Sequence, residues 1–166
     1  MNNNLIITIG REYGTGGREI GQKLALRLGV PFYDRELITR AAKKTGFDEK
    51  LFEQLDKRAT NSFLYSLTMF GSVGLNGMSL TDQLYLAQSN IIREMAEDSS
   101  CVIVGRCADH VLRDFPNKFD FFIHGSIEDR VKRVQTCGDY VIEGKTPEAA
   151  LEKMDKQRST YYNYYT

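Results

Sequence analysis

The feature that most constrains the fold is the segment from Leu5 to Leu28, where an apolar run leads through a glycine-rich loop into an amphipathic helix. Residues 5–9 are apolar or β-branched, as in a strand buried on both faces of a parallel sheet. Residues 10–19 contain four glycines, and Ile20, Leu24 and Leu28 then recur at four-residue steps, which predicts one buried helix face. A strand, a glycine turn and a helix aim backbone N–H groups and a helix N-terminus at a phosphate. We therefore predict a nucleotide site at this loop.

The loop departs from both common nucleotide-binding motifs. The P-loop pattern is G-x-x-x-x-G-K-[ST], in which the lysine reaches the phosphates and the hydroxyl holds magnesium. With Gly16 as its second glycine, Arg11 stands at the first glycine and Gly17 at the lysine. The nearest cation on this side is Arg18, and Glu19 follows it instead of Ser or Thr; Glu19 also replaces the third glycine of the dinucleotide pattern G-x-G-x-x-G. By itself, the loop also allows a less favoured alternative, a tight strand-to-helix turn that binds no ligand.

Composition limits the classes of partner. The chain has 166 residues, which suits one domain, and its 22 Lys+Arg balance 22 Asp+Glu. Because there is no basic excess, we expect neither a nucleic-acid polymer nor a membrane as partner, and any phosphate specificity must come from local arginines. The three cysteines lack C-x-x-C spacing, and there is no signal peptide or long apolar span. These features predict a reduced, cytoplasmic protein.

Strand-like and helix-like segments alternate along the rest of the chain, which predicts an α/β fold with a parallel sheet flanked by helices. We expect further strands at 30–34, 101–104 and 119–123, and helices at 36–44, 48–57, 79–98 and 108–114, from 126 onward and from 146 onward. In the helix at 79–98, the predicted buried residues are Leu84, Ala87, Ile91 and Met95. The apolar segment 61–70 precedes three spaced glycines, so it is either a mobile flap over a ligand or a connector.

Four stretches carry a family resemblance: IGREYGTGGREI (9–20), PFYD (31–34), CVIVGRCAD (101–109) and DKQRSTYY (155–162). In this order they resemble the cytidylate kinase-like family of P-loop proteins. The resemblance implies a single P-loop NTPase-like domain over residues 1–166, with a helical acceptor-binding or flap segment near 35–80 and a lid segment near 137–160. It also implies ATP-dependent phosphorylation of a nucleoside monophosphate such as CMP or dCMP, with ATP and Mg²⁺ as cofactors.

The resemblance also implies residue roles. The residues expected to bind the ATP phosphates are Arg11, Gly14, Thr15, Gly16, Gly17, Arg18 and Glu19. Arg18 is the expected substitute for the lysine, since an arginine forks onto two oxygens where a lysine is a point charge. The expected catalytic residues are Arg18, Arg130 and Arg158. Asp155 and Arg158 match the acid and the arginine of the lid, which closes onto phosphates and excludes water.

The acceptor side is expected at the end of the strand 101–104, where ligands bind in open α/β sheets. Arg106 matches the arginine of a Gly-Arg-Asp motif that holds the acceptor nucleotide in related kinases. Cys107 stands where that motif has its aspartate, and Asp109 is a candidate to replace it. Asp34 is a further acceptor-side candidate, which could hold magnesium or the acceptor sugar, or merely cap the next helix.

The same residues also allow simpler interpretations. Arg130 with Glu128 or Asp129, and Arg158 with Asp155, could form solvated ion pairs on helix surfaces, and we interpret Arg133 as a surface residue.

Two features leave the site and the sheet incomplete. No carboxylate ends the strand 101–104, so the magnesium ligand is unassigned. Related kinases continue with a strand and a helix after the lid, so we expect an open sheet edge unless a partner chain covers it, as in a homo-oligomer, or the sequence is partial.

Two other functions remain open at this stage. Gly17 at the lysine position and the missing acid suggest a nucleotide-binding regulatory protein with weak catalysis. Asp34 after the second strand suggests a dinucleotide-binding domain, which Glu19 disfavours.

Overall fold

The structure is a computed structural model that describes residues 3–34, 80–138, 140 and 146–166. Its strands are β1 (Ile6–Arg11), β2 (Phe32–Tyr33), β3 (Cys101–Val104) and β4 (Lys118–Ile123). Its helices are α1 (Gly17–Leu28), α5 (Leu80–Asp98), α6 (Ala108–Val111), α7 (Ile127–Thr136) and α8 (Pro147–Tyr165). The helices predicted at 36–44 and 48–57, and the segment 61–70, lie outside the described residues. None of the described helices is long and apolar enough to cross a membrane.

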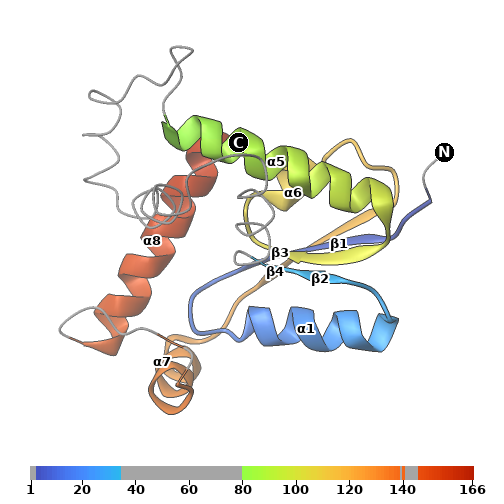
Figure 1. The fold of residues 1–166 in the computed structure, drawn as a ribbon. Coiled ribbons are helices and arrows are strands. Elements are labelled where there is room, and N and C mark those ends of the chain that lie inside the picture. The colour runs from blue at the N-terminus through green and yellow to red at the C-terminus, as the bar shows by residue number, and fades with distance from the viewer. Residues whose placement is uncertain (1–2, 35–79, 139, 141–145) are drawn as a thin grey trace.

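The strands form one parallel sheet in the order β2-β3-β1-β4, with helices on both faces. Figure 1 shows α1 on one side of the sheet and α5 with α6 on the other. On the α1 side, Ile9 and Val104 pack with Ala25 of α1. On the other side, Ile103 packs with Ile92 of α5. The predicted α/β fold with a parallel sheet is therefore confirmed.

The strand order also bears on the dinucleotide-binding alternative. In the usual dinucleotide-binding order, the second strand lies beside the first. Here β3 lies between β1 and β2. The described sheet therefore does not have the dinucleotide-binding arrangement.

The buried face of α1 differs from the predicted one. Ile20 and Leu28, which were expected to be buried, are 43% and 44% exposed. The helix instead contacts the sheet through Gly21 and Ala25, which are buried. A Cβ atom at Gly21 would lie 2.7 Å from the nearest side-chain carbon of Val104. Small residues thus allow a closer approach than the larger apolar residues would permit.

The buried face of α5 is also shifted. Leu84 and Ile91 are buried as predicted, whereas Ala87 and Met95 are only half-buried. The residues that the prediction missed are Gln88, Ser89, Ile92 and Ala96. The side chain of Gln88 is almost fully buried, and its amide nitrogen and oxygen have no hydrogen-bond partner among the described residues.

β4 forms one edge of the described sheet, beside β1. Asp120, a polar residue within this strand, accepts a hydrogen bond from the Thr8 hydroxyl at 2.6 Å and pairs with Lys118. These contacts explain how a carboxylate is accommodated in the strand. The aromatic residues of β4 are more than half exposed: Phe119, Phe121 and Phe122. Among the described residues β4 has a neighbouring strand on one side only, and its exposed aromatic side chains form an apolar surface at this edge.

Candidate functional site

The loop between β1 and α1 has the geometry of an anion site. Gly14 and Gly16 have φ angles of 83° and 77°, in the left-handed region that favours glycine. A Cβ at Gly14 would lie 2.9 Å from Val134, so the backbone and the space both require glycine there. Within the described residues, no backbone carbonyl accepts a hydrogen bond from the N–H groups of Gly14, Gly16 or Gly17. Together with the N-terminus of α1, these amides can bind an anion.

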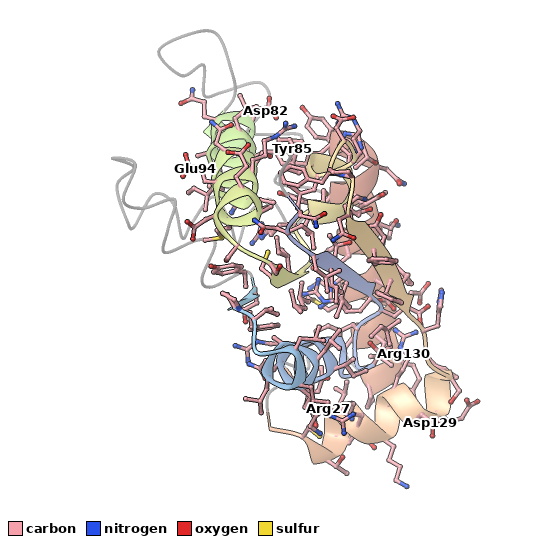
Figure 2. The ribbon with its side chains drawn as sticks, turned by 90° about the vertical axis from the view of Figure 1, so that its right-hand side faces the viewer. Arg27, Asp82, Tyr85, Glu94, Asp129 and Arg130 are labelled. Atoms are coloured by element: carbon pink, nitrogen blue, oxygen red, sulfur yellow. The ribbon has the colours of Figure 1, made fainter. Side chains whose placement is uncertain are left out.

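Arg130 of α7 contacts this loop with a nearly buried guanidinium. Its side chain is 8% exposed, and its Nε donates to the carbonyl oxygen of Tyr13 at 2.8 Å. The guanidinium also pairs with Asp155 of α8 and lies 3.3 Å from a carboxylate oxygen of Glu12. Asp155 in turn accepts from the backbone N–H of Tyr13 at 2.6 Å. Figure 2 shows Arg130 on the inner side of α7 and Asp129 directed outward, so the predicted surface pair with Glu128 or Asp129 is wrong.

Arg158 of α8 reaches the same loop. One of its terminal nitrogens donates to the carbonyl oxygen of Arg11 at 3.1 Å, and its guanidinium lies 5.2 Å from the centre of the Tyr13 ring. Burial lowers the pKa of this guanidinium. Arg158 is therefore not a solvated surface residue. In this conformation Arg130 and Arg158, the two predicted catalytic arginines of α7 and α8, bind carbonyl oxygens of the loop.

Arg133, interpreted from the sequence as a surface residue, lies against the loop. Its guanidinium covers Gly16, where an added Cβ would lie 2.7 Å from the central guanidinium carbon. It pairs with Glu19 of α1, and its Nε donates to the hydroxyl of Tyr140 at 3.3 Å. Arg133 is thus partly exposed, as interpreted from the sequence, and it also contacts the glycine loop. The available sequence signal was its position one helical turn after Arg130.

Arg18 contacts the end of β2. Its Nε donates to a carboxylate oxygen of Asp34 at 2.6 Å, and the side chain of Asp34 is 7% exposed. This pair joins the first turn of α1 to the strand beside β3. Two residues assigned from the sequence to different halves of the site thus contact each other.

Arg11 connects the glycine loop with the turn after β3. The aliphatic part of its side chain packs on Gly17, where a Cβ would lie 2.8 Å away. Its guanidinium lies against Gly105, which has a φ of 82° and no room for a Cβ. Arg11 therefore extends from the predicted phosphate loop to the predicted acceptor turn.

The turn after β3 has an unusual backbone conformation and contacts α8. Arg106 and Cys107 have φ angles of 58° and 52°, which non-glycine residues rarely adopt and which occur preferentially at functional sites. The guanidinium of Arg106 lies 5.7 Å from the centre of the Tyr161 ring. Burial raises the pKa of the Cys107 thiol to about 12, so this residue cannot supply the negative charge of an aspartate.

Asp109, the predicted replacement for that aspartate, faces α8. Its carboxylate accepts a hydrogen bond from the Tyr162 hydroxyl at 2.6 Å, and this bond raises the pKa of Tyr162 to about 12. The backbone oxygen of Asp109 accepts from Lys118 at 3.0 Å. Asp109 therefore helps to attach the tyrosine-rich end of α8 to the acceptor turn.

The described residues suggest no magnesium ligand. They contain no group of three or more His, Cys, Asp or Glu side chains arranged to hold a metal ion. The carboxylates around the glycine loop and the end of β2 each contact an arginine: Glu12, Glu19, Asp34 and Asp155. Magnesium usually takes one or two carboxylates together with substrate phosphates, and here these carboxylates already have cationic partners. We therefore assign no residue to the metal.

Comparisons with known proteins bear on the family and the fold of the chain. The model of the cytidylate kinase-like family matches residues 6–166. A crystal structure of an uncharacterized protein from Eubacterium ventriosum shares 32% identity with a TM-score of 0.66, covering 98% of this chain and 78% of that chain.

Shikimate kinase structures are similar at lower identity. The one from Bacteroides thetaiotaomicron has 16% identity and a TM-score of 0.53, covering 96% of this chain and 82% of its own. The one from Acinetobacter baumannii, in complex with shikimate, has 16% identity and a TM-score of 0.50, covering 98% and 80%. No curated protein matches the sequence significantly. The fold is that of the P-loop kinases.

Proposed function

We propose that this chain, which belongs to the cytidylate kinase-like family, transfers a phosphoryl group from ATP to a nucleoside monophosphate such as CMP or dCMP. The observation that carries the proposal is the position of Arg11, whose side chain extends from Gly17 of the anion loop to Gly105 of the acceptor turn. Phosphoryl transfer depends on positioning and on neutralising oxygens between donor and acceptor. A guanidinium between the two half-sites is suited to both tasks.

In this proposal each element has one task. The amides of Gly14, Gly16 and Gly17 bind the ATP phosphates, and Arg106 binds the acceptor phosphate. An acceptor phosphate oxygen attacks the γ-phosphorus, the bond to the β,γ-bridging oxygen breaks, and ADP leaves. Mg²⁺ would enter with ATP and would supply further charge neutralisation, with no residue of this chain assigned to hold it. Arg130 and Arg158 fix the loop through its carbonyl oxygens.

The free cysteines fit a reducing, cytoplasmic environment.

The test is a coupled assay of ADP release over a panel of nucleoside monophosphates, with Arg11→Gln as the variant. We expect acceptor-dependent ADP release from the wild type and a loss of kcat of roughly 100-fold in Arg11→Gln, with ATP affinity changed much less. The matched control is Arg27→Gln in the last turn of α1, which removes the same charge away from the loop and should leave kcat unchanged. If Arg11→Gln retains wild-type kcat, Arg11 does not act on the transferred group.

Arg106→Ala tests the acceptor half of the site. We expect weaker acceptor binding, seen as a higher KM for the monophosphate, with ATP binding largely kept. An unchanged acceptor affinity would remove this role from Arg106.

One alternative has specific support. Gly17 stands at the lysine position and no carboxylate ends β3, as expected of a nucleotide-binding regulatory protein with weak catalysis. The same assay separates the two functions: ATP binding without ADP release for any monophosphate would favour the regulator.

A further inference from the structure

The glycine loop lacks the lysine of a standard P-loop, and the structure brings another cation to the same place. The guanidinium of Arg133 covers Gly16, with its nitrogens 2.8 and 2.9 Å from the position of an added Cβ. Gly16 immediately precedes Gly17, the residue at the lysine position. Arg18, the cation nearest in sequence, is engaged with Asp34 at 2.6 Å. Spatially, Arg133 is therefore the better replacement for the lysine.

The scaffold fixes Arg133 in this position. α7 begins at a Ser126 cap, whose hydroxyl accepts from the backbone N–H of Asp129 at 3.1 Å. Arg130, one turn before Arg133, is anchored to the loop, and Val134, the next residue, is 2% exposed. The contacts of Arg130 and Val134 on either side of Arg133 hold α7 against the glycine loop. Glu19 and Tyr140 then hold the guanidinium of Arg133 at the loop.

Glu19 is the counter-ion of Arg133 and differs from the other carboxylates near the loop. Its side chain is about half exposed, and it also pairs with Lys23 at 2.6 Å. Lys23, and then Arg133, lower the pKa of Glu19, so that it is anionic at neutral pH. An exposed ion pair is worth little, so an incoming anion can replace this carboxylate at small cost. Arginine binds carboxylate and phosphate through the same pairs of N–H groups.

We propose that Arg133 supplies the positive charge that lysine supplies in a standard P-loop, and that Glu19 holds Arg133 over Gly16 until a nucleotide phosphate displaces the carboxylate. This inference rests on the proposed function in that the ligand is a nucleoside triphosphate. It assigns the two nearby arginines to different tasks: Arg133 to the donor phosphates and Arg18 to the junction with β2. It also predicts that removing the negative charge of Glu19 improves binding.

The experiment measures the affinity of ATP and of inorganic tripolyphosphate by calorimetry for the wild type and three variants. Arg133→Gln should weaken both ligands by about 10- to 100-fold, because charge-assisted hydrogen bonds to phosphate are lost. Glu19→Gln should tighten both by about two- to tenfold, because the competing carboxylate is removed. Arg27→Gln in the last turn of α1, the matched control for charge, should change either affinity less than threefold.

Two further variants separate a local effect from a structural one. Arg133→Lys keeps the charge and should recover most of the affinity lost in Arg133→Gln. Lys23→Gln removes the other partner of Glu19 and should leave affinity near that of the wild type. In the double variant Glu19→Gln with Arg133→Gln, the gain from Glu19→Gln should disappear, because the two effects act through one contact.

Wild-type affinity in Arg133→Gln, or weaker binding in Glu19→Gln, would overturn the inference while leaving the proposed kinase function intact. Failure of the proposed kinase function can also be distinguished from failure of this inference. The expected order of affinities, with no ADP release for any nucleoside monophosphate, would support the role of Arg133 and contradict the kinase. Absence of ATP and tripolyphosphate binding in the wild type would contradict both.

Discussion

Asp155 joins α8 to the glycine loop, and its removal should destabilise the protein strongly. One carboxylate oxygen accepts from the N–H of Tyr13 at 2.6 Å, and the other pairs with Arg130, whose side chain is 8% exposed. Asp155→Ala removes both contacts and leaves a buried guanidinium with Glu12, at 3.3 Å, as its remaining anion. We therefore expect the free energy of unfolding to fall by several times the contribution of a surface ion pair.

The magnitude follows from the contacts. Hydrogen bonds to charged groups contribute about 1.5–3 kcal/mol each, and breaking a buried ion pair costs about 3–5 kcal/mol. The side chain of Asp155 is 28% exposed and Glu12 remains, which places the loss at the lower end. We expect the free energy of unfolding to fall by about 3 kcal/mol in Asp155→Ala. Asp155→Asn, which keeps an acceptor for Tyr13, should lose about half as much.

The assay is urea unfolding followed by circular dichroism. With a slope of about 2 kcal/mol/M, a loss of about 3 kcal/mol lowers the midpoint by about 1.5 M. The control is Glu152→Ala, which removes an exposed carboxylate three residues earlier on α8 and should change stability by less than about 0.5 kcal/mol. Equal midpoints for Asp155→Ala and Glu152→Ala would refute the reasoning, since they would show that the contact to the loop contributes nothing beyond a surface charge.

Two further predictions concern glycine and buried polarity. Gly14→Ala should lower the free energy of unfolding by about 2–4 kcal/mol, because the φ of Gly14 is 83° and an added Cβ would meet Val134. Gly29→Ala should lose only about 1 kcal/mol, because Gly29 has a φ of 64° but an added Cβ would have no atom within 4 Å. Thermal unfolding of the two variants measures the difference, and equal losses of stability would show that the contact with Val134 contributes nothing. Gln88→Leu should raise stability by about 1–2 kcal/mol, because its buried carboxamide has no hydrogen-bond partner among the described residues. A lower melting temperature would contradict this.

The elements that the sequence predicted correctly are those with local signals. β3 has the predicted bounds because an unbroken apolar run needs no partner to be recognised. The start of α8 follows from Thr146 and Pro147, and the Thr146 hydroxyl accepts from the N–H of Ala149 at 3.2 Å. The start of α7 follows in the same way from Ser126. Helix caps and apolar runs depend on residues that are close together in the chain, so they can be recognised from the sequence alone.

The buried helix faces were less predictable because they depend on what lies over each helix. In α1, the four-residue spacing of Ile20, Leu24 and Leu28 identifies an apolar stripe, yet the sheet contacts Gly21 and Ala25. Hydrophobic periodicity identifies positions with large apolar side chains, whereas the close packing of α1 on the sheet requires small residues. α1 packs mainly on β3, whose residues lie more than 70 positions later in the chain.

The roles of the arginines were the least predictable part of the site, and the reason is physical. Sequence spacing shows that Arg130 and Arg133 share a helix face, but their partners at the glycine loop, Tyr13 and Glu19, lie more than 110 residues earlier. Arg130 meets a carbonyl oxygen and two carboxylates, so its charge is balanced within the fold. Arg133 meets the exposed Glu19, which solvent or a ligand can replace. An arginine with fixed internal partners stabilises the loop, whereas an arginine with an exchangeable partner is available to bind phosphate. The distinction depends on partner burial, which only the folded chain determines.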